Sequence, residues 1–578
     1  MPTVLNRSAL QDGAVTLSPL PGSRDASTQT QISFLGVPAA ELSVISVVGS
    51  RSGVHRGQLE AYSQGDGASF LPSRPFAEGE RVTVRAQLRT AGSVRALLDE
   101  FTIAQEDRIS STPEPSHRGN AEVQSFRSRP DLKPPTVTVT AQSPAVAAGD
   151  LFLAPYLGPG QGGPMILEPS GGLLWFDPLP VNTAAADLQV QEYEGKPVLT
   201  WWQGDINVHG FGTGEGVIAD SSYTDIAHVR AGNGLREDLH ELQLTPQGTA
   251  LITAYHPIRC DLSAMGGLAD GGVTDSVAQE IDVRTGLVMF EWTSIDHVAL
   301  DESYEPSLPE TTTAASPYDF FHLNSVNLDH DGSLLISSRN TWTVYKVSAD
   351  SGQIVWRLGG KHSSFKMGAG TGTAWQHDAR ELPGGAISIF DNGAAPTAHS
   401  QSRAIVISLD AATDTATLVA RLTHTPPLVV ESQGSAQALA NGDWLVGWGQ
   451  QPYLSEFGPQ AQLLFDAHLP RQYESYRDYR FAWTGTPSYP PVFAFASEAT
   501  GPTVYASWNG ATLVSSWRVL AGPNASSLAT VTEVPRSGFE TTIPIPAETV
   551  GPYLAVQALN AAGEVLGTSA TASEPGLG

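Results

Sequence analysis

The sequence predicts an all-β protein, in which a six-bladed β-propeller is flanked by N-terminal and C-terminal β-sandwich domains. Short apolar segments are separated by turns along all 578 residues, which include 57 glycines and 41 prolines. Strand–turn–strand patterns recur through the middle of the chain, and no stretch requires a long amphipathic helix. The length indicates several domains, because single cores stop growing at about 250–300 residues.

Residues 1–135 are predicted to form an N-terminal β-sandwich followed by a connecting strap. Between residues 14 and 105, alternating segments such as "TQISFLGV" and "RVTVRAQL" are separated by Gly, Pro and Ser turns. This spacing is typical of a small sandwich. Residues 105–135 are polar and contain several prolines, so they are expected to connect two domains and not to build a core.

Residues 136–490 are predicted to form the propeller, because two kinds of hairpin alternate along them. One kind covers residues 240–255, 326–340, 379–393 and 436–450, and its turn glycines are 84, 53 and 57 residues apart: Gly248, Gly332, Gly385 and Gly442. The other kind covers residues 280–292, 345–358 and 406–422. Two hairpins in roughly 50–60 residues make the four strands of a propeller blade, which predicts about six blades.

Residues 491–578 return to short strands such as "TVYASW", "SSWRVLAG" and "PYLAVQALN". This pattern predicts a C-terminal fibronectin-like or immunoglobulin-like sandwich.

The charge and the cysteine content exclude several kinds of partner and site. The net charge of −27, from 32 basic and 59 acidic residues, argues against nucleic acids and anionic membranes. An anionic substrate therefore requires a local cluster of cations. Cys260 is the only cysteine, so intramolecular disulfides and thiolate zinc clusters are excluded and a buried thiol is expected.

No segment approaches the roughly 20 apolar residues of a membrane-spanning helix. The start "MPTVLNRSALQDGAV" also lacks the apolar region of a secretion signal. We expect a soluble protein, either secreted with its signal absent from this chain or cytoplasmic; the sequence predicts no oligomeric state.

Three histidines occupy nearly the same position in successive hairpins, 8, 10 and 8 residues before the turn glycine: His240, His322 and His377. If each lies where an inner strand begins, all three point into one end of the propeller channel. Arg339 would approach them from the far end of the hairpin that His322 opens. Imidazole and guanidinium groups suit a tetrahedral oxyanion such as sulfate or phosphate.

Other interpretations of these residues stay open. A histidine in a propeller can be a structural hydrogen-bond partner, and Arg339 can brace a blade through an ion pair. Three histidines can also bind a metal, but the absence of a carboxylate at compact ligand spacing leads us to predict no metal. The segments "HGFGTGEG" and "GGKHSS" do not match nucleotide-binding loops, so no nucleotide cofactor is predicted.

Four segments closely resemble the arylsulfotransferase family: "DLHELQLTPQGTALITAY", "FFHLNSVNLDHDGSLLISSRN", "WRLGGKHSSF" and "WQHDARELPGGAISIFDNG". The resemblance covers about residues 150–470, and the N-terminal sandwich resembles the accessory domain of actinobacterial and fungal members. It implies a six-bladed propeller that moves a sulfuryl group from an aryl sulfate to a phenol without PAPS or another cofactor. By motif position, the transiently sulfated histidine is His377, supported by His240, His322 and Arg339.

The resemblance also suggests substrate contacts and leaves two other functions open. Asn324 of the "H-x-N-S" motif, Trp375 and Trp448 are expected to bind substrate, although tryptophans can instead pack between blades. Asn340 stands where enterobacterial members carry a further basic residue. The pocket could alternatively perform hydrolysis, elimination or cyclisation with His377 as acid or base, or the chain could be a non-enzymatic binding protein.

Overall fold

The computed structural model describes residues 15–90, 93–108, 112–113, 122–306, 316–499, 501–546 and 551–573. Helical structure in these residues is limited to three short 3-10 helices: η3 (Ala39–Glu41), η4 (Ser263–Met265) and η5 (Leu300–Glu302). None of the helices in the described ranges is long and apolar enough to cross a membrane. The all-β prediction is confirmed.

Two four-stranded antiparallel sheets form the N-terminal region. One has the order β1 (Thr16–Ser18), β2 (Ile32–Leu35), β6 (Gly67–Pro72), β5 (Gly57–Ala61), and the other β4 (Gly53–His55), β3 (Leu42–Gly49), β7 (Arg81–Thr90), β8 (Ser93–Thr102). Apolar side chains of both sheets, such as Phe34 and Val84, share one buried cluster.

The middle of the chain is a succession of mostly four-stranded units. The first has the order β13 (Leu173–Phe176), β12 (Met165–Leu167), β10 (Asp150–Leu153), β36 (Tyr479–Phe481), beside the pair β11 (Pro155–Tyr156) and β35 (Glu474–Ser475). An eight-stranded sheet then contains β14 (Ala184–Tyr193), β15 (Lys196–Ile206), β16 (Gly212–Ala219), β17 (Asp225–Val229), β18 (Glu237–Leu244), β19 (Thr249–Cys260), β20 (Gly271–Asp282) and β21 (Val288–Thr293). Its two halves are joined by a single pairing, Gly214 with Glu237.

Three further sheets follow in chain order. The first has the order β22 (Leu323–Leu328), β23 (Leu334–Ser338), β24 (Thr343–Val347), β25 (Ile354–Gly359). The second has the order β27 (His377–Glu381), β28 (Ile387–Asp391), β29 (Arg403–Asp410), β30 (Thr415–Leu422), β26 (Lys366–Met367). The third has the order β31 (Ser435–Ala438), β32 (Trp444–Gly447), β33 (Tyr453–Phe457), β34 (Leu463–His468), β9 (Thr138–Gln142).

Strands from the start and the end of this region pair with one another. β9 lies beside β34, and β10 lies beside β36. Residues 138–153 are therefore hydrogen-bonded to residues 463–481, which brings the two ends of the region together.

The hairpins predicted from the turn glycines are all present. Gly248, Gly332, Gly385 and Gly442 each donate a backbone hydrogen bond to the carbonyl three residues earlier, and each has a φ between 77° and 90°. A side chain is disfavoured at such a φ, which explains why the same residue recurs at this position. The blade count and the domain boundaries stay predictions.

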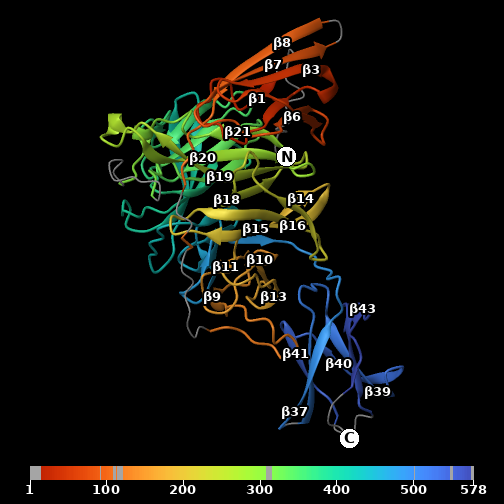
Figure 1. Ribbon diagram of the computed structural model, residues 1–578. Helices are drawn as coiled ribbons and strands as arrows, with labels where there is room; N and C mark the ends of the chain where they lie inside the picture. The colour runs from red at the N-terminus through yellow and green to blue at the C-terminus, as the bar shows by residue number, and fades with distance from the viewer. Residues whose placement is uncertain are drawn as a thin grey trace.

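The C-terminal region contains a three-stranded sheet and a five-stranded sheet. The first is β37 (Val492–Glu498), β38 (Gly501–Ser507), β41 (Glu540–Pro544), and the second is β40 (Ser527–Pro535), β39 (Ser516–Asn524), β42 (Tyr553–Leu559), β43 (Val565–Thr568), with β44 (Ala572–Ser573) beside β42. Figure 1 shows the N-terminal sheets at one end of the molecule, the C-terminal sheets at the other, and the long middle region between them.

Candidate active site

One cavity of about 370 Å³ is lined by all four residues predicted to act in catalysis. His240 lies within β18, His322 directly precedes β22, Arg339 directly follows β23, and His377 is the first residue of β27. The structure therefore brings together side chains that are up to 137 residues apart in the chain.

A local irregularity of the sheet accompanies each of the three histidines. The strand register shifts between Glu237 and Leu242, between Leu323 and Ser325, and between His377 and Arg380. A β-bulge at the rim of a sheet bends the strand and redirects a side chain. The backbone of His322 also has a φ of 54°, a left-handed conformation that is uncommon for a residue with a side chain.

Buried amides and a buried arginine connect the backbones that carry these residues. The Asn324 amide donates to the carbonyl of Gln376, at 2.7 Å, and the Gln376 amide donates to the carbonyl of Ser338, at 2.8 Å. Arg477, which is fully buried, donates to the carbonyls of His240, at 2.9 Å, and Asn324, at 2.8 Å. Each carbonyl belongs to a catalytic candidate or to a residue one or two positions from one, so this network sets their relative positions.

The hydrogen bonds of Asn392 determine which nitrogen of His377 carries its proton. The Asn392 amide nitrogen donates to the carbonyls of Val430 and Gln433, so its Oδ1 faces Nδ1 of His377, at 2.7 Å. Because this oxygen is an acceptor, Nδ1 of His377 carries the hydrogen. Nε2 then carries the lone pair, which accepts one long hydrogen bond, of 3.3 Å, from the backbone N–H of Gln433.

The other two histidines each contact an aspartate through Nδ1. His322 lies 2.6 Å from Oδ2 of Asp319, and His240 contacts Oδ1 of Asp238. The two imidazole rings are 5.2 Å apart and nearly perpendicular. An aspartate on Nδ1 fixes the ring orientation and directs Nε2 away from itself.

Arg339 is held by neutral acceptors and an aromatic ring. Its guanidinium donates to Oδ1 of Asn340, at 2.9 Å, and to the carbonyl of Glu431, at 3.3 Å. The guanidinium carbon lies 4.9 Å from the ring centroid of Trp375. These contacts orient the group without neutralising its charge.

Burial controls protonation in the cavity. It lowers the pKa of His377 well below the usual value, and the positive charge of Arg339 adds to this effect. The pKa of His322 is also lowered well below its usual value, by burial and then by His240. Burial raises the pKa of Asp319 to about 7, so the Asp319–His322 pair can exchange one proton near neutral pH. The cavity thus combines an unprotonated imidazole with a fixed cation.

Three residues expected to contact substrate lie behind the cavity wall. Asn324 is fully buried and acts on the backbone beside His377, as described above. Trp375 is 2% exposed and supports Arg339 from behind. Trp448 is fully buried in an apolar cluster with Phe390, and its Nε1 donates to Ser455. The aromatic side chains in the wall are instead Tyr156, Phe211 and Tyr476.

The sequence interpretation gave no role to Asn392, Asp238 or Asp319. The sequence does contain a signal for Asp238 and Asp319, because they stand two residues before His240 and three residues before His322. Asn392 lies within the quoted "FDNG" motif, but its contact with His377 depends on the pairing of β27 with β28.

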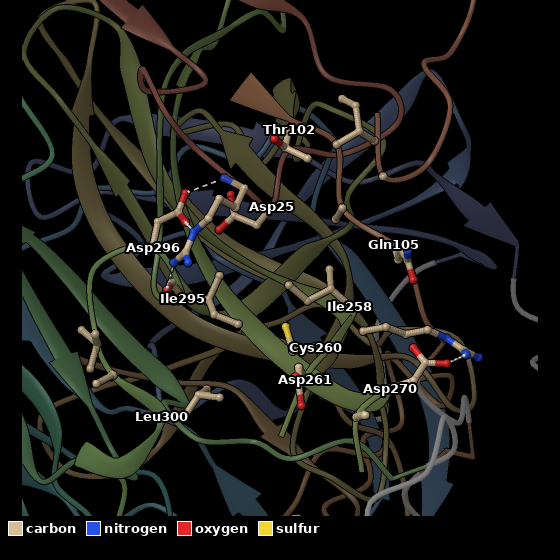
Figure 2. Close-up of a pocket in the computed structure, with 18 residues that line it drawn as sticks. Asp25, Thr102, Gln105, Ile258, Cys260, Asp261, Asp270, Ile295, Asp296 and Leu300 are labelled. Atoms are coloured by element: carbon tan, nitrogen blue, oxygen red, sulfur yellow. Dashed lines mark hydrogen bonds and ion pairs between the residues drawn. The ribbon is translucent and has the colours of Figure 1, made fainter. Parts of the chain in front are cut away.

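A larger cavity, of about 680 Å³, lies elsewhere in the molecule, between the N-terminal sheets and β19 (Figure 2). Its wall holds several aspartates and Cys260, and none of its described lining residues is a histidine. Burial raises the pKa of the Cys260 thiol to about 12, which makes it a poor nucleophile. The histidine cavity is therefore the better candidate for an active site.

The fold and the site together define a class of protein: an all-β protein whose cavity holds a buried cluster of imidazoles around one guanidinium. Residues 189–469 match the family model described as arylsulfotransferase (ASST). This segment, which includes all four catalytic candidates, therefore belongs to the arylsulfotransferase family. No curated protein shows significant sequence similarity to the chain.

Solved structures with some similarity have low TM-scores. A protein of unknown function from Bacteroides caccae is 13% identical, with 57% of this chain and 98% of that chain covered and a TM-score of 0.34. An auxiliary nutrient binding protein from Bacteroides ovatus is 9% identical (88% and 96% covered; TM-score 0.27). An inactive variant of virginiamycin B lyase from Staphylococcus aureus is 11% identical (57% and 93% covered; TM-score 0.25).

Proposed function

We propose that this protein transfers a sulfuryl group from an aryl sulfate ester to a phenol, with Nε2 of His377 as the nucleophile. The observation that carries this proposal is the contact of Nδ1 with Asn392, which leaves the Nε2 lone pair in a cavity containing Arg339. Membership of the arylsulfotransferase family supports the same reaction class.

In the first half-reaction, Nε2 attacks the sulfur of the ester. The N–S bond forms while the S–O bond to the aryl group breaks, and the electron pair of that bond leaves on the phenolate oxygen. The guanidinium of Arg339 stabilises the negative charge on the sulfuryl oxygens, and His240, when protonated, donates from Nε2. The Asp319–His322 pair gives its exchangeable proton to the phenolate.

In the second half-reaction, a second phenol takes the place of the first. The same Asp319–His322 pair accepts its proton, and the phenolate oxygen attacks the sulfur. The N–S bond breaks and its electron pair returns to Nε2 of His377, which restores the starting enzyme. Two half-reactions at one nucleophile predict ping-pong kinetics without a cofactor.

The proposal includes the architecture that holds the site. We assign residues 136–490 to a six-bladed propeller, residues 1–135 to an N-terminal sandwich with its strap, and residues 491–578 to a C-terminal sandwich. The propeller is supported by six groups of about four strands and by the pairing of β9 and β10 with β34 and β36. Propeller blades direct their inner strands toward a common axis, which accounts for the convergence of the histidines.

The test is mass spectrometry of protein incubated with p-nitrophenyl sulfate in the absence of an acceptor. We expect the peptide containing His377 to gain the mass of one SO₃ group, and a later addition of phenol to remove it. The His377→Asn variant should acquire no sulfated peptide. The matched control is His362→Asn, because His362 is an exposed histidine in the same part of the chain.

Equal labelling of the wild type and His377→Asn would overturn the assignment of the nucleophile. Absence of any labelling, together with turnover of another compound that is lost in His377→Asn, would favour the alternative that the pocket performs hydrolysis, elimination or cyclisation.

A further inference from the structure

Three potential metal ligands converge at the end of the strands opposite to the histidine cavity. Asp329 and His330 form the turn after β22, and Glu381 is the last residue of β27. Nδ1 of His330 lies 2.6 Å from Oδ1 of Asp329 and 2.6 Å from Oε1 of Glu381. All three atoms lie within 4.8 Å of one another.

The hydrogen of the His330 ring cannot serve both carboxylates of this cluster at once. Nδ1 of an imidazole carries at most one hydrogen, yet here it faces two carboxylate oxygens at the same short distance. The second oxygen of each carboxylate already has a donor: the backbone N–H of His330 for Glu381, at 2.8 Å, and Lys346 for Asp329, at 2.6 Å. Oδ1 of Asp329 also accepts from the backbone N–H of His330, at 2.5 Å. The imidazole nitrogen and the two inner oxygens thus face a common point with a single ring hydrogen to share.

The charges around this point favour a divalent cation. Lys346 bridges Asp329 and Asp331, at 2.6 and 2.7 Å, and Glu381, which contacts His330, adds a third carboxylate to the cluster. With the ammonium group included, the formal sum is −2, and one divalent cation would neutralise it. The ammonium also holds the outer oxygen of Asp329, as supporting groups around metal ligands do.

The surroundings leave room for a complete coordination shell. A cavity of about 470 Å³ is lined by His330 and Glu381 together with residues 382–385. Ligand atoms on a tetrahedral zinc ion are roughly 3.3 Å apart, given bond lengths of about 2.0–2.1 Å. Nδ1 of His330, which is 2.6 Å from each oxygen, thus has to move away from them by less than about 1 Å, and the His330 side chain is 69% exposed.

We propose that Asp329, His330 and Glu381 bind one divalent transition-metal cation, such as Zn²⁺, through Oδ1, Nδ1 and Oε1, with water completing the coordination. This site is separate from the proposed reaction. β27 runs from His377 to Glu381, so the two ends are about 13 Å apart at about 3.3 Å per residue. The cation would join the sheet of β22 to the sheet of β27 and stabilise the arrangement that sets His322 beside His377.

The experiment uses tag-free, chelator-treated full-length protein titrated with Zn²⁺ in a calorimeter. We expect one saturable equivalent in the wild type and at least tenfold weaker binding in His330→Asn and in Glu381→Gln. The control His362→Asn should bind as the wild type does. Zn²⁺ should also raise the thermal unfolding midpoint of the wild type but not of the two ligand variants.

The histidine cavity is a competing zinc site, so His377→Asn is titrated in parallel. Zinc binding that is lost in His377→Asn but retained in His330→Asn would place the metal in the cavity and overturn the proposal. Absence of a saturable equivalent, or binding of Ca²⁺ in preference to Zn²⁺, would also overturn it. A visible absorption spectrum of the Co²⁺ form, present in the wild type and absent in Glu381→Gln, provides a readout of coordination that does not depend on stability.

Discussion

The histidine cavity and the larger cavity beside the N-terminal sheets differ in how their charged groups are used. In the larger cavity, arginines pair with aspartates: Arg24 with Asp296, at 3.0 Å, and Arg259 with Asp270, at 2.8 Å (Figure 2). In the histidine cavity, Arg339 is oriented by an amide oxygen and a carbonyl, which leave its charge available to an anion.

The two cavities also differ in what burial does to their acids and bases. In the larger one, burial raises the pKa of Asp25 to about 7, and no basic group donates to its Oδ2 within the described residues. In the smaller one, three imidazoles have a defined partner on Nδ1, which directs the other nitrogen away from that partner: His240, His322 and His377. The orientation of the polar groups, and not the volume, therefore distinguishes the two cavities.

The largest effect is expected when the guanidinium of Arg339 is removed from the histidine cavity. Arg339→Met should lower kcat for sulfuryl transfer by about 10²–10³-fold, because the charge developing on the sulfuryl oxygens loses its main stabilising group. Arg339→Lys should recover part of the rate, since it restores the charge but not the planar fork. The measurement is steady-state kinetics with p-nitrophenyl sulfate and phenol.

Arg24→Met is the matched control for this prediction, because Arg24 is an arginine of the other cavity that is paired with Asp296. It should leave kcat close to that of the wild type. Equal losses in the two variants would mean that the two cavities do not differ as proposed.

A smaller effect is expected from Asn392, which positions His377 without touching the reacting atoms. Asn392→Leu removes the acceptor for the Nδ1 hydrogen and should lower kcat about 10–100-fold with little change in KM. Asn392→Asp places a carboxylate there, which raises the pKa of His377 and removes the lone pair at neutral pH. Its activity should therefore recover as the pH rises from 7 to 9, whereas a merely structural defect would show no such recovery.

The pH dependence of the second half-reaction tests the proton-exchanging pair. Because the pKa of Asp319 is raised to about 7, the Asp319–His322 pair is protonated below that pH and accepts a proton from the phenol above it. Desulfation of pre-sulfated enzyme by phenol should therefore speed up as the pH rises through about 7. Asp319→Asn should be about tenfold slower and should lose this inflection. Rapid-quench measurements between pH 5 and 9 supply the data, and an unchanged inflection would contradict the role of Asp319.

Sequence patterns were sufficient to predict the hairpins and the convergence of the histidines. The turn glycines require a positive φ, and a histidine at a fixed distance before such a turn lies at a fixed place on the strand. Gly248 and Gly385 both follow their histidine by 8 residues, and both histidines line the same cavity.

The partners of the histidines could not be predicted in the same way. The contact between His377 and Asn392 depends on strand register, and the bulge after His377 shifts that register locally. Trp448 could equally have lined a channel or filled a core, because both environments favour a large aromatic ring. Its full burial beside Phe390 follows from how neighbouring sheets pack, which composition does not reveal.

The smallest effect is expected at Asp25, in the larger cavity, and it concerns stability and not activity. Asp25 is 1% exposed, and its pKa is raised from about 3.8 to about 7, first by burial and then by Asp296. Burial also raises the pKa of Asp275, which neighbours Asp25. Between pH 4 and 7 the folded protein therefore binds more protons at this position than the unfolded chain does.

Because the folded protein binds more protons at Asp25, its free energy of unfolding should fall as the pH rises from about 4 to about 7 and then become constant. Asn is neutral at every pH, so Asp25→Asn should have a higher unfolding midpoint than the wild type at pH 8, by about 1–3 °C, with a smaller difference at pH 5. Asp270→Asn, at the exposed side of the same cavity, should show no such gain. A midpoint of Asp25→Asn that lies below the wild type at pH 8 would contradict the raised pKa. Because Asp25 lies outside the histidine cavity, its variant should transfer sulfate at the wild-type rate, and a loss of transfer would make the larger cavity part of the active site.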